Sequence, residues 1–142
     1  EKAHPDVFNV LYPLTPVHSY VVSGGKEHEI SLMAYDVATY TSFMNGSREP
    51  WRRITTQAGT GRRALVICDS FGHALTPYLL AYYDEVHMCD FRYGYYDHTA
   101  AGGYIRDHIA RYGIDDVYII ISSANDLRKD NSIKYLRRYL GF

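Results

Sequence analysis

The sequence has no apolar run long enough to cross a lipid bilayer. Its longest run, around "VYIII", is far shorter than the roughly 20 residues that a membrane helix needs. It also has little net charge, because 15 basic residues nearly balance 16 acidic ones. No overall charge therefore favours nucleic acid or an anionic membrane, and we expect the arginine pairs at 52–53, 62–63 and 137–138 to be solvated surface. Two cysteines are too few for a disulfide scaffold.

Motifs that bind cofactors are missing as well. No Cys and His cluster has metal-ligand spacing, and the Gly-rich "AGTGRR" precedes a strand, whereas a phosphate cradle opens a helix. We therefore expect no cofactor and no metal. No signal peptide is visible, but the chain opens at "EKAHPDVF" without Met, and we expect a processed or excised piece of a longer protein. The 15 tyrosines suit both a carbohydrate-facing surface and a large amphipathic core.

A length of 142 residues predicts one domain, read here as two unequal parts. Residues 1–60 lack an alternation of strands and helices and predict a β-rich lead-in packed on the same domain. Within it, apolar runs on both sides of Gly24-Gly25 predict a hairpin. A second hairpin is expected around "AGTG", between "WRRITT" and "RRALVIC".

Residues 61–142 alternate buried strands with amphipathic segments. Strands are expected at 64–68, 85–90 and 116–123, and helices at 77–83, from Asp97 or Thr99 to just before Gly113, and at 131–140. In the first helix Thr76 is the expected N-cap and Pro77 the first residue. This alternation predicts an α/β fold, a three-layer sandwich with a mostly parallel, flavodoxin-like sheet. Cys68 and Cys89 end neighbouring strands, as two buried thiols or as a disulfide.

Polar residues follow each of the three predicted strands. Ser70, Asp90 and Asn125 come after strand ends, and the carboxyl ends of parallel strands share one edge of the sheet. In "VICDSFG", Ser70 is a candidate nucleophile, with the N–H groups of Ser70 and Gly72 as candidate oxyanion donors. The alternative is that Asp69 or Ser70 merely caps the turn.

The run "CDSFGHALTPYL" resembles the nucleophile block of the SGNH/GDSL hydrolases. The longer stretch from "RRALVIC" to "FRYGYY" is similar to the DHHW family of that superfamily, and the similarity extends over about residues 40–125. Two features depart from the family pattern. Cys68 stands where the family has lysine or glycine, and the Asp-His-His-Trp segment is not in these 142 residues.

The resemblance implies an SGNH-like fold and a secreted or cell-surface bacterial protein. It implies a serine esterase or O-acyltransferase that acts on acylated glycans, with Ser70 as the nucleophile, a histidine as base and an aspartate that orients it. "SSAND" resembles the block whose Asn donates to the oxyanion, so Asn125 has that role or makes an Asx-turn. Neither a nucleic acid nor direct membrane insertion is implied.

A serine without a base is a weak nucleophile, so the histidines decide between activity and a silent fold. His73 is expected at a turn or on a helix surface, and His87 is expected to point into a helix layer, as a packed or a surface histidine. Asp97-His98 is the tentative pair inside the chain, although Asp97 could instead cap a helix beside an exposed His98. The alternatives are that an upstream segment or a partner chain supplies Asp and His, or that the chain is an inactive binding or assembly module.

A planar arginine follows the second predicted strand. Arg92 carries a fixed set of donors suited to a carboxylate, so it is expected to brace the rim by binding Asp69 or Asp90, with substrate binding as the alternative. The isolated chain is expected to be inactive or nearly so.

Overall fold

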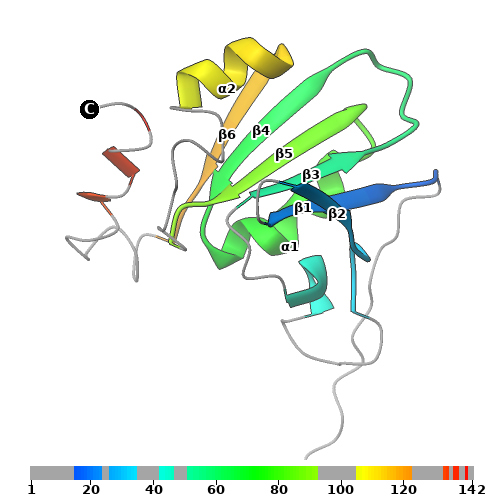
Figure 1. The fold of residues 1–142 in the computed structure, drawn as a ribbon, viewed down its shortest axis with the longest axis horizontal. Coiled ribbons are helices and arrows are strands. Elements are labelled where there is room, and N and C mark those ends of the chain that lie inside the picture. The colour runs from blue at the N-terminus through cyan, green and yellow to red at the C-terminus, as the bar shows by residue number, and fades with distance from the viewer. Residues whose placement is uncertain are drawn as a thin grey trace, which may run out of the picture.

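A computed structural model describes residues 15–23, 26–34, 42–46, 51–92 and 105–122, together with residues 133, 134, 136, 137 and 140. Strands dominate this part of the chain and form one six-stranded sheet in the order β2-β1-β3-β5-β4-β6 (Figure 1). The strands are β1 (His18–Ser23), β2 (Lys26–Glu29), β3 (Trp51–Thr55), β4 (Arg63–Cys68), β5 (Glu85–Asp90) and β6 (Asp116–Ile120). The helices are α1 (Ser70–Leu79) and α2 (Ile105–Tyr112), with a 3-10 turn η2 (Met44–Gly46).

The sheet is mixed, which corrects the predicted fold class. β4 pairs in parallel with β5 and β6, whereas β5 with β3, β3 with β1 and β1 with β2 are antiparallel. The mostly parallel, flavodoxin-like three-layer sandwich was therefore a wrong prediction. The apolar rhythm of residues 64–120 did indicate three parallel strands. It could not show that the strands of the lead-in continue the same sheet with antiparallel pairing.

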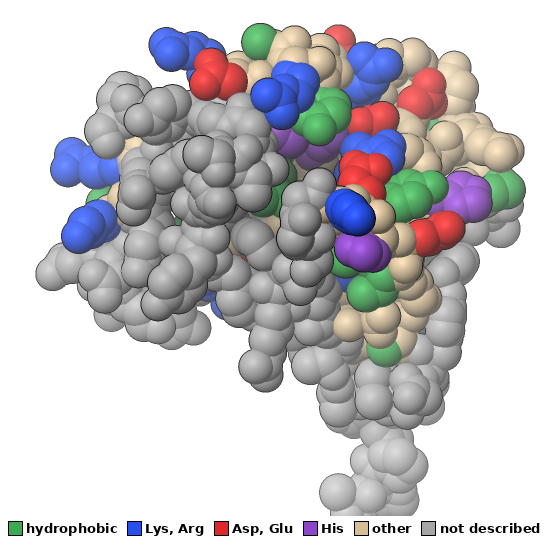
Figure 2. All heavy atoms as spheres, viewed as in Figure 1, with side chains coloured by type: hydrophobic (Ala, Val, Ile, Leu, Met, Phe, Trp, Pro, Cys, Tyr) green, Lys and Arg blue, Asp and Glu red, His purple; other side chains and the backbone are tan. Residues whose placement is uncertain are grey.

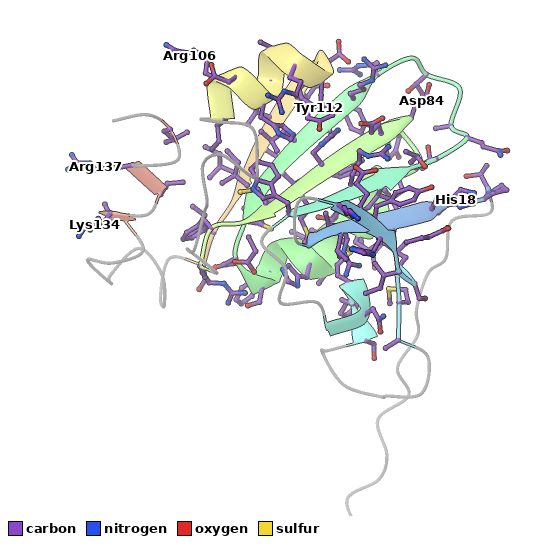
Figure 3. The ribbon with its side chains drawn as sticks, viewed as in Figure 1. His18, Asp84, Arg106, Tyr112, Lys134 and Arg137 are labelled. Atoms are coloured by element: carbon purple, nitrogen blue, oxygen red, sulfur yellow. The ribbon has the colours of Figure 1, made fainter. Side chains whose placement is uncertain are left out.

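Of the two predicted hairpins, the first is confirmed and the second is wrong. β1 and β2 pair across Ser23 and Lys26, so the first hairpin is confirmed. The second is wrong, because β5 lies between β3 and β4 and pairs with both. The loop that separates β3 from β4 is instead held by Asp84, whose carboxylate accepts the N–H groups of Thr60 (2.9 Å) and Gly61 (2.8 Å). Asp84 is labelled in Figure 3.

Helix α1 begins directly after β4, earlier than predicted. Asp69 is its N-cap and accepts the Phe71 N–H at 2.8 Å, so the helix needs no cap at Thr76, and Pro77 falls within its last turn. Gly72 permits this immediate start. A Cβ added at Gly72 would lie 2.1 Å from the Cβ of Cys68, so any larger residue would force the helix away from the strand end.

Helix α2 ends as the sequence predicts. Gly113 follows it with a φ of 59°, the left-handed conformation common after a helix C-terminus. The expected start at Asp97 or Thr99 lies outside the described residues. Of the last predicted helix, the five described residues between 133 and 140 are helical.

The sheet has a buried core on each face. Cys68 belongs to the core on the α1 side, and Cys89 to the core that includes Ile105 of α2. Both cysteines are free thiols, so the disulfide alternative is wrong. Burial raises the pKa of the Cys68 thiol, which keeps it protonated and inert. Arg52 is 1% exposed, against the expectation that the arginine pairs are surface, and burial lowers its pKa to about 10.

Among the described residues, no helix combines the length and apolar character required to traverse a membrane.

Candidate functional site

The ends of β4, β5 and β6 and the start of α1 meet around Ser70. Ser70 is the first residue of α1, immediately after β4, and is partly buried. The fully buried Asp69 before it accepts the Ser122 N–H at 2.6 Å through its second carboxylate oxygen, while its own N–H donates to the Ile120 carbonyl at 3.2 Å. These bonds tie the end of β4 to the end of β6, so the serine stands on a firmly held corner of the sheet.

The Ser70 hydroxyl faces a guanidinium. Nη1 of Arg92 donates to Ser70 Oγ at 3.2 Å. Arg92 also grips Asp90 with two further donors, from Nε to Oδ1 at 3.0 Å and from Nη2 to Oδ2 at 2.7 Å. This bidentate geometry fixes the plane of the guanidinium and directs Nη1 at the serine. Of the two carboxylates proposed for Arg92, the structure selects Asp90.

His73 was missed as a member of this site. The expectation of a turn or helix surface is wrong, because His73 is 6% exposed and its Nε2 lies 2.9 Å from Asp90 Oδ2. The prediction failed because it began the helix at Pro77. Once α1 starts at Ser70, His73 and Thr76 are three residues apart and share its buried face.

Asp90 carries the negative charge of the site. Its side chain is fully buried, which by itself would raise its pKa. Hydrogen bonds from Arg92 and His73, together with the charge of Arg92, outweigh burial and hold the pKa of Asp90 below its usual value. Asp90 therefore stays ionised and keeps Arg92 in place beside the serine.

The predicted oxyanion donors are only partly described. The Gly72 N–H donates to the Asp69 carbonyl at 3.1 Å, so that bond would have to open before Gly72 could donate to a ligand. The Ser70 N–H lies in the first turn of α1, where N–H groups have no partner within the helix. Asn125 and the tentative pair Asp97 and His98 lie outside the described residues.

No described imidazole hydrogen-bonds to Ser70. His73 is engaged by Asp90, His87 by Glu85 and by His108, and His18 by Glu29. The described part of the site can orient and polarise a hydroxyl, and it can stabilise negative charge on oxygen. It contains no proton acceptor for the serine.

A second cluster of titratable groups occupies the other end of β5. His87 Nε2 lies 2.5 Å from Glu85 Oε1, and His87 Nδ1 lies 2.9 Å from His108 Nε2. Of the two alternatives for His87, the structure selects packing, because the ring of Tyr112 in α2, labelled in Figure 3, lies 4.5 Å away. An open pocket of about 350 Å³ lies beside it, lined by Glu27, Arg53, Arg63, Glu85, Arg111 and Tyr112.

Charges of both signs lie close together on this face of the molecule (Figure 2). Within the ranges that the structure describes, no group of three His, Cys, Asp or Glu side chains could hold a metal ion.

Comparison with solved structures agrees with this architecture. No protein-family model matches the sequence, and no curated protein matches it. Among solved structures, the chain is similar to a DHHW family protein from Eubacterium siraeum, with a TM-score of 0.75 and 25% identity over 94% of this chain and 44% of that one.

Two structures of Bacillus cereus PatB1 share the fold at 22% identity. The structure with a sulfonyl adduct has a TM-score of 0.58 and covers 79% of this chain and 38% of that one. The other structure has a TM-score of 0.56 and covers 79% of this chain and 36% of that one. The chain thus spans less than half of each of these proteins, and it shares the architecture of a DHHW family protein.

Proposed function

We propose that the chain is the serine-bearing part of an SGNH-like esterase or O-acyltransferase that acts on acylated glycans outside the bacterial cell. The observation that carries the proposal is the position of Ser70, at the start of a helix, at the carboxyl end of a parallel strand, with an Arg92 N–H directed at its Oγ. The similarity to a DHHW family protein over 94% of the chain supports it.

The proposed reaction is acyl transfer through Ser70. Its Oγ attacks the ester carbonyl while a histidine takes the hydroxyl proton, and a tetrahedral oxyanion forms. Collapse of this intermediate breaks the bond to the sugar oxygen, which takes the proton from the histidine and leaves an acyl-serine. Attack by water then gives a hydrolase, and attack by a second hydroxyl gives a transferase.

The base comes from outside the described residues. Asp97 and His98 are the tentative pair in this chain, and the alternative source is an upstream segment or a partner chain. In either case the histidine has to reach hydrogen-bonding distance of Ser70 Oγ, roughly 3 Å. The described residues around Ser70 do not supply this base. The group that contacts the hydroxyl is Arg92, whose guanidinium cannot be deprotonated in a protein.

The oxyanion would be held by fixed donors. The Ser70 N–H and the side chain of Asn125 are the proposed pair, and Gly72 joins them if its bond to the Asp69 carbonyl opens. Arg92 adds a positive charge that favours a negative oxygen at this corner. Asp90 keeps Arg92 in position through two hydrogen bonds.

A serine-directed fluorophosphonate tests the proposal in the full-length protein. We expect covalent labelling that peptide mapping places on Ser70 and that Ser70→Ala abolishes. A Ser31→Ala variant is the matched control, because Ser31 is exposed and bonds to the Met33 carbonyl far from this corner. Absence of labelling under conditions in which a control esterase reacts would contradict the proposal.

One observation favours a second function. The described histidines that form hydrogen bonds, His18, His73 and His87 among them, bond to groups other than Ser70. On this reading the fold is a catalytically silent module kept for binding or assembly. It predicts that the full-length protein binds glycan without hydrolysing esters. Release of acetate from an acetylated glycan, lost in Ser70→Ala, would exclude it.

A further inference from the structure

The pocket beside His87 is built mainly from charged side chains. Its lining consists of Glu27 of β2, Arg53 of β3, Arg63 of β4, Glu85 of β5, and Arg111 and Tyr112 of α2. Its volume of about 350 Å³ lies within the range of small-molecule sites, about 300–1,000 Å³. Arg63 begins β4 and Ser70 follows its end, so the pocket and the serine lie about 20 Å apart along the strand. The pocket is therefore separate from the serine site.

The charges of the pocket lining do not cancel. Three arginines lie beside two glutamates, and both glutamates are ionised because their pKa values are lowered. The pKa of Glu27 is lowered mainly by its hydrogen bond from Arg53, and that of Glu85 mainly by its bond to His87. Three positive and two negative charges leave one net positive charge. An anion with a single negative charge would balance it.

Both glutamates are already engaged by groups other than Arg63 and Arg111. Arg53 donates to both oxygens of Glu27, from Nε to Oε1 at 2.8 Å and from Nη2 to Oε2 at 2.6 Å. Glu85 Oε1 lies 2.5 Å from His87 Nε2. Glu85 Oε2 lies 3.9 Å from Arg53 Nη1, which is too far for a hydrogen bond. This second oxygen of Glu85 can therefore accept a hydrogen bond from a ligand.

The other two arginines carry the unbalanced charge. Nη1 of Arg63 donates to the backbone carbonyl of Tyr112 at 3.0 Å, and this acceptor is uncharged. Within the described part of the chain, the Arg63 side chain has no other hydrogen bond, and the exposed Arg111 has neither a hydrogen bond nor an ion pair. The pocket thus presents two guanidinium groups that no carboxylate of the described residues binds.

We propose that this pocket binds a small hydroxy acid, whose carboxylate lies between Arg63 and Arg111 and whose hydroxyl donates to Glu85. A guanidinium matches the planar, two-oxygen geometry of a carboxylate. A singly charged carboxylate balances the net charge of the lining, whereas a phosphate dianion would exceed it and would meet the two glutamates. The free oxygen of Glu85 accounts for the hydroxyl, because an ionised carboxylate only accepts hydrogen bonds.

Calorimetric titration of the full-length protein with sodium gluconate, at constant ionic strength, tests the proposal. We expect saturable binding. Sorbitol has the same carbon chain with an alcohol in place of the carboxylate, and it should bind at least tenfold more weakly. Inorganic phosphate at about pH 8, where it is doubly charged, should also bind at least tenfold more weakly. Absence of saturable gluconate binding, or equal binding of sorbitol or phosphate, would overturn the proposal.

Arginine variants assign the binding to this pocket. Arg63→Gln and Arg111→Gln should each weaken gluconate binding at least tenfold. Arg106→Gln is the matched control, because it removes the same charge from the same helix at a side chain that is 86% exposed and outside the pocket lining. Arg106 and Tyr112 mark the two ends of α2 in Figure 3. A comparable loss in Arg106→Gln would indicate non-specific attraction and overturn the proposal.

Two further variants separate binding from folding and from the serine site. Arg111 makes no bond to a described residue, so Arg111→Gln should fold normally and decides the outcome if Arg63→Gln does not fold. Ser70→Ala should leave gluconate affinity unchanged, because the serine lies at the other end of β4. A loss of gluconate binding in Ser70→Ala would place the ligand at the serine and overturn the proposal.

Discussion

Both ends of β5 hold a carboxylate bonded to a buried histidine, yet only one end looks like a reaction site. At the carboxyl end Asp90 binds His73 at 2.9 Å, and at the amino end Glu85 binds His87 at 2.5 Å. The two carboxylates differ in burial, because Asp90 is fully buried and the Glu85 side chain is 19% exposed. An acid–histidine pair is therefore not by itself a mark of catalysis in this fold.

The third group at each end makes the difference. Asp90 positions Arg92 so that its remaining donor meets a serine hydroxyl, whereas Glu85 has Arg53 only at 3.9 Å, and Arg53 is already paired with Glu27. The other ring nitrogen of His87 hydrogen-bonds to His108 and not to a nucleophile. The carboxyl end is organised around a hydroxyl, and the amino end around packing and charge pairing.

Removal of the two carboxylates should give the largest contrast. We expect Asp90→Ala to lower the free energy of unfolding by about 3–5 kcal/mol, because it leaves a buried histidine and an arginine without their partner. Glu85→Ala should cost about 1 kcal/mol, since water can replace part of its interaction. Urea unfolding of both variants measures the difference, and equal costs would show that the two pairs are equivalent.

Substitution of Arg92 and of Arg53 compares the two ends of β5 by the reactivity of Ser70. Arg92→Gln should slow fluorophosphonate labelling of Ser70 by roughly tenfold or more, because a charged donor to the reacting oxygen is lost. Arg92→Lys should fall between Arg92→Gln and the wild type, since it keeps the charge but not the two-pronged grip on Asp90. Arg53→Gln, at the other end of β5, should leave the labelling rate unchanged. A similar drop in Arg53→Gln would mean that the effect is global.

Acid should weaken both ends, with a smaller effect than the substitutions. The pKa of Asp90 is lowered despite burial, by its bonds to Arg92 and His73, and the pKa of Glu85 is lowered mainly by its bond to His87. A carboxylate with a lowered folded pKa adds stability above its unfolded pKa, about 3.9 for Asp and 4.3 for Glu, and that stability is lost as pH falls through the folded value.

The stability advantage of the wild type over Asp90→Asn should accordingly be full near pH 6 and shrink below about pH 4. Glu85→Gln should behave in the same way with a smaller amplitude. Denaturant unfolding from pH 6 to pH 3 measures both curves. An advantage over Asp90→Asn that grows in acid would contradict the ionised state assigned to Asp90.

The sequence predicted the local elements better than their assembly. Continuous apolar runs located β4, β5 and the start of β6, and Gly113 marked the end of α2. Strand partners could not be predicted in the same way, because the apolar faces of β3 and β4 fit a hairpin as well as they fit a shared neighbour, β5. The direction of the lead-in strands depends on that choice.

Ser70, Asp90 and Arg92 lie together, whereas His73, which bonds to Asp90, was missed. The first three were recognisable because each stands at or just after the end of a strand, where side chains converge. His73 was not, since its burial depends on the exact residue at which α1 begins. The cap formed by Asp69 and the close approach of Gly72 to Cys68 fix that residue. Both contacts are local, but a turn was predicted after Ser70 and the helix was predicted to begin at Pro77.

The central claim is that Ser70 is a nucleophile whose base comes from outside the described residues. A crystal structure of the full-length protein tests it most directly, through the distance from Ser70 Oγ to the closest imidazole nitrogen. We expect a histidine within roughly 3 Å, oriented by an aspartate. A Ser70 that still meets only Arg92, with no imidazole within reach directly or through one water, would contradict it.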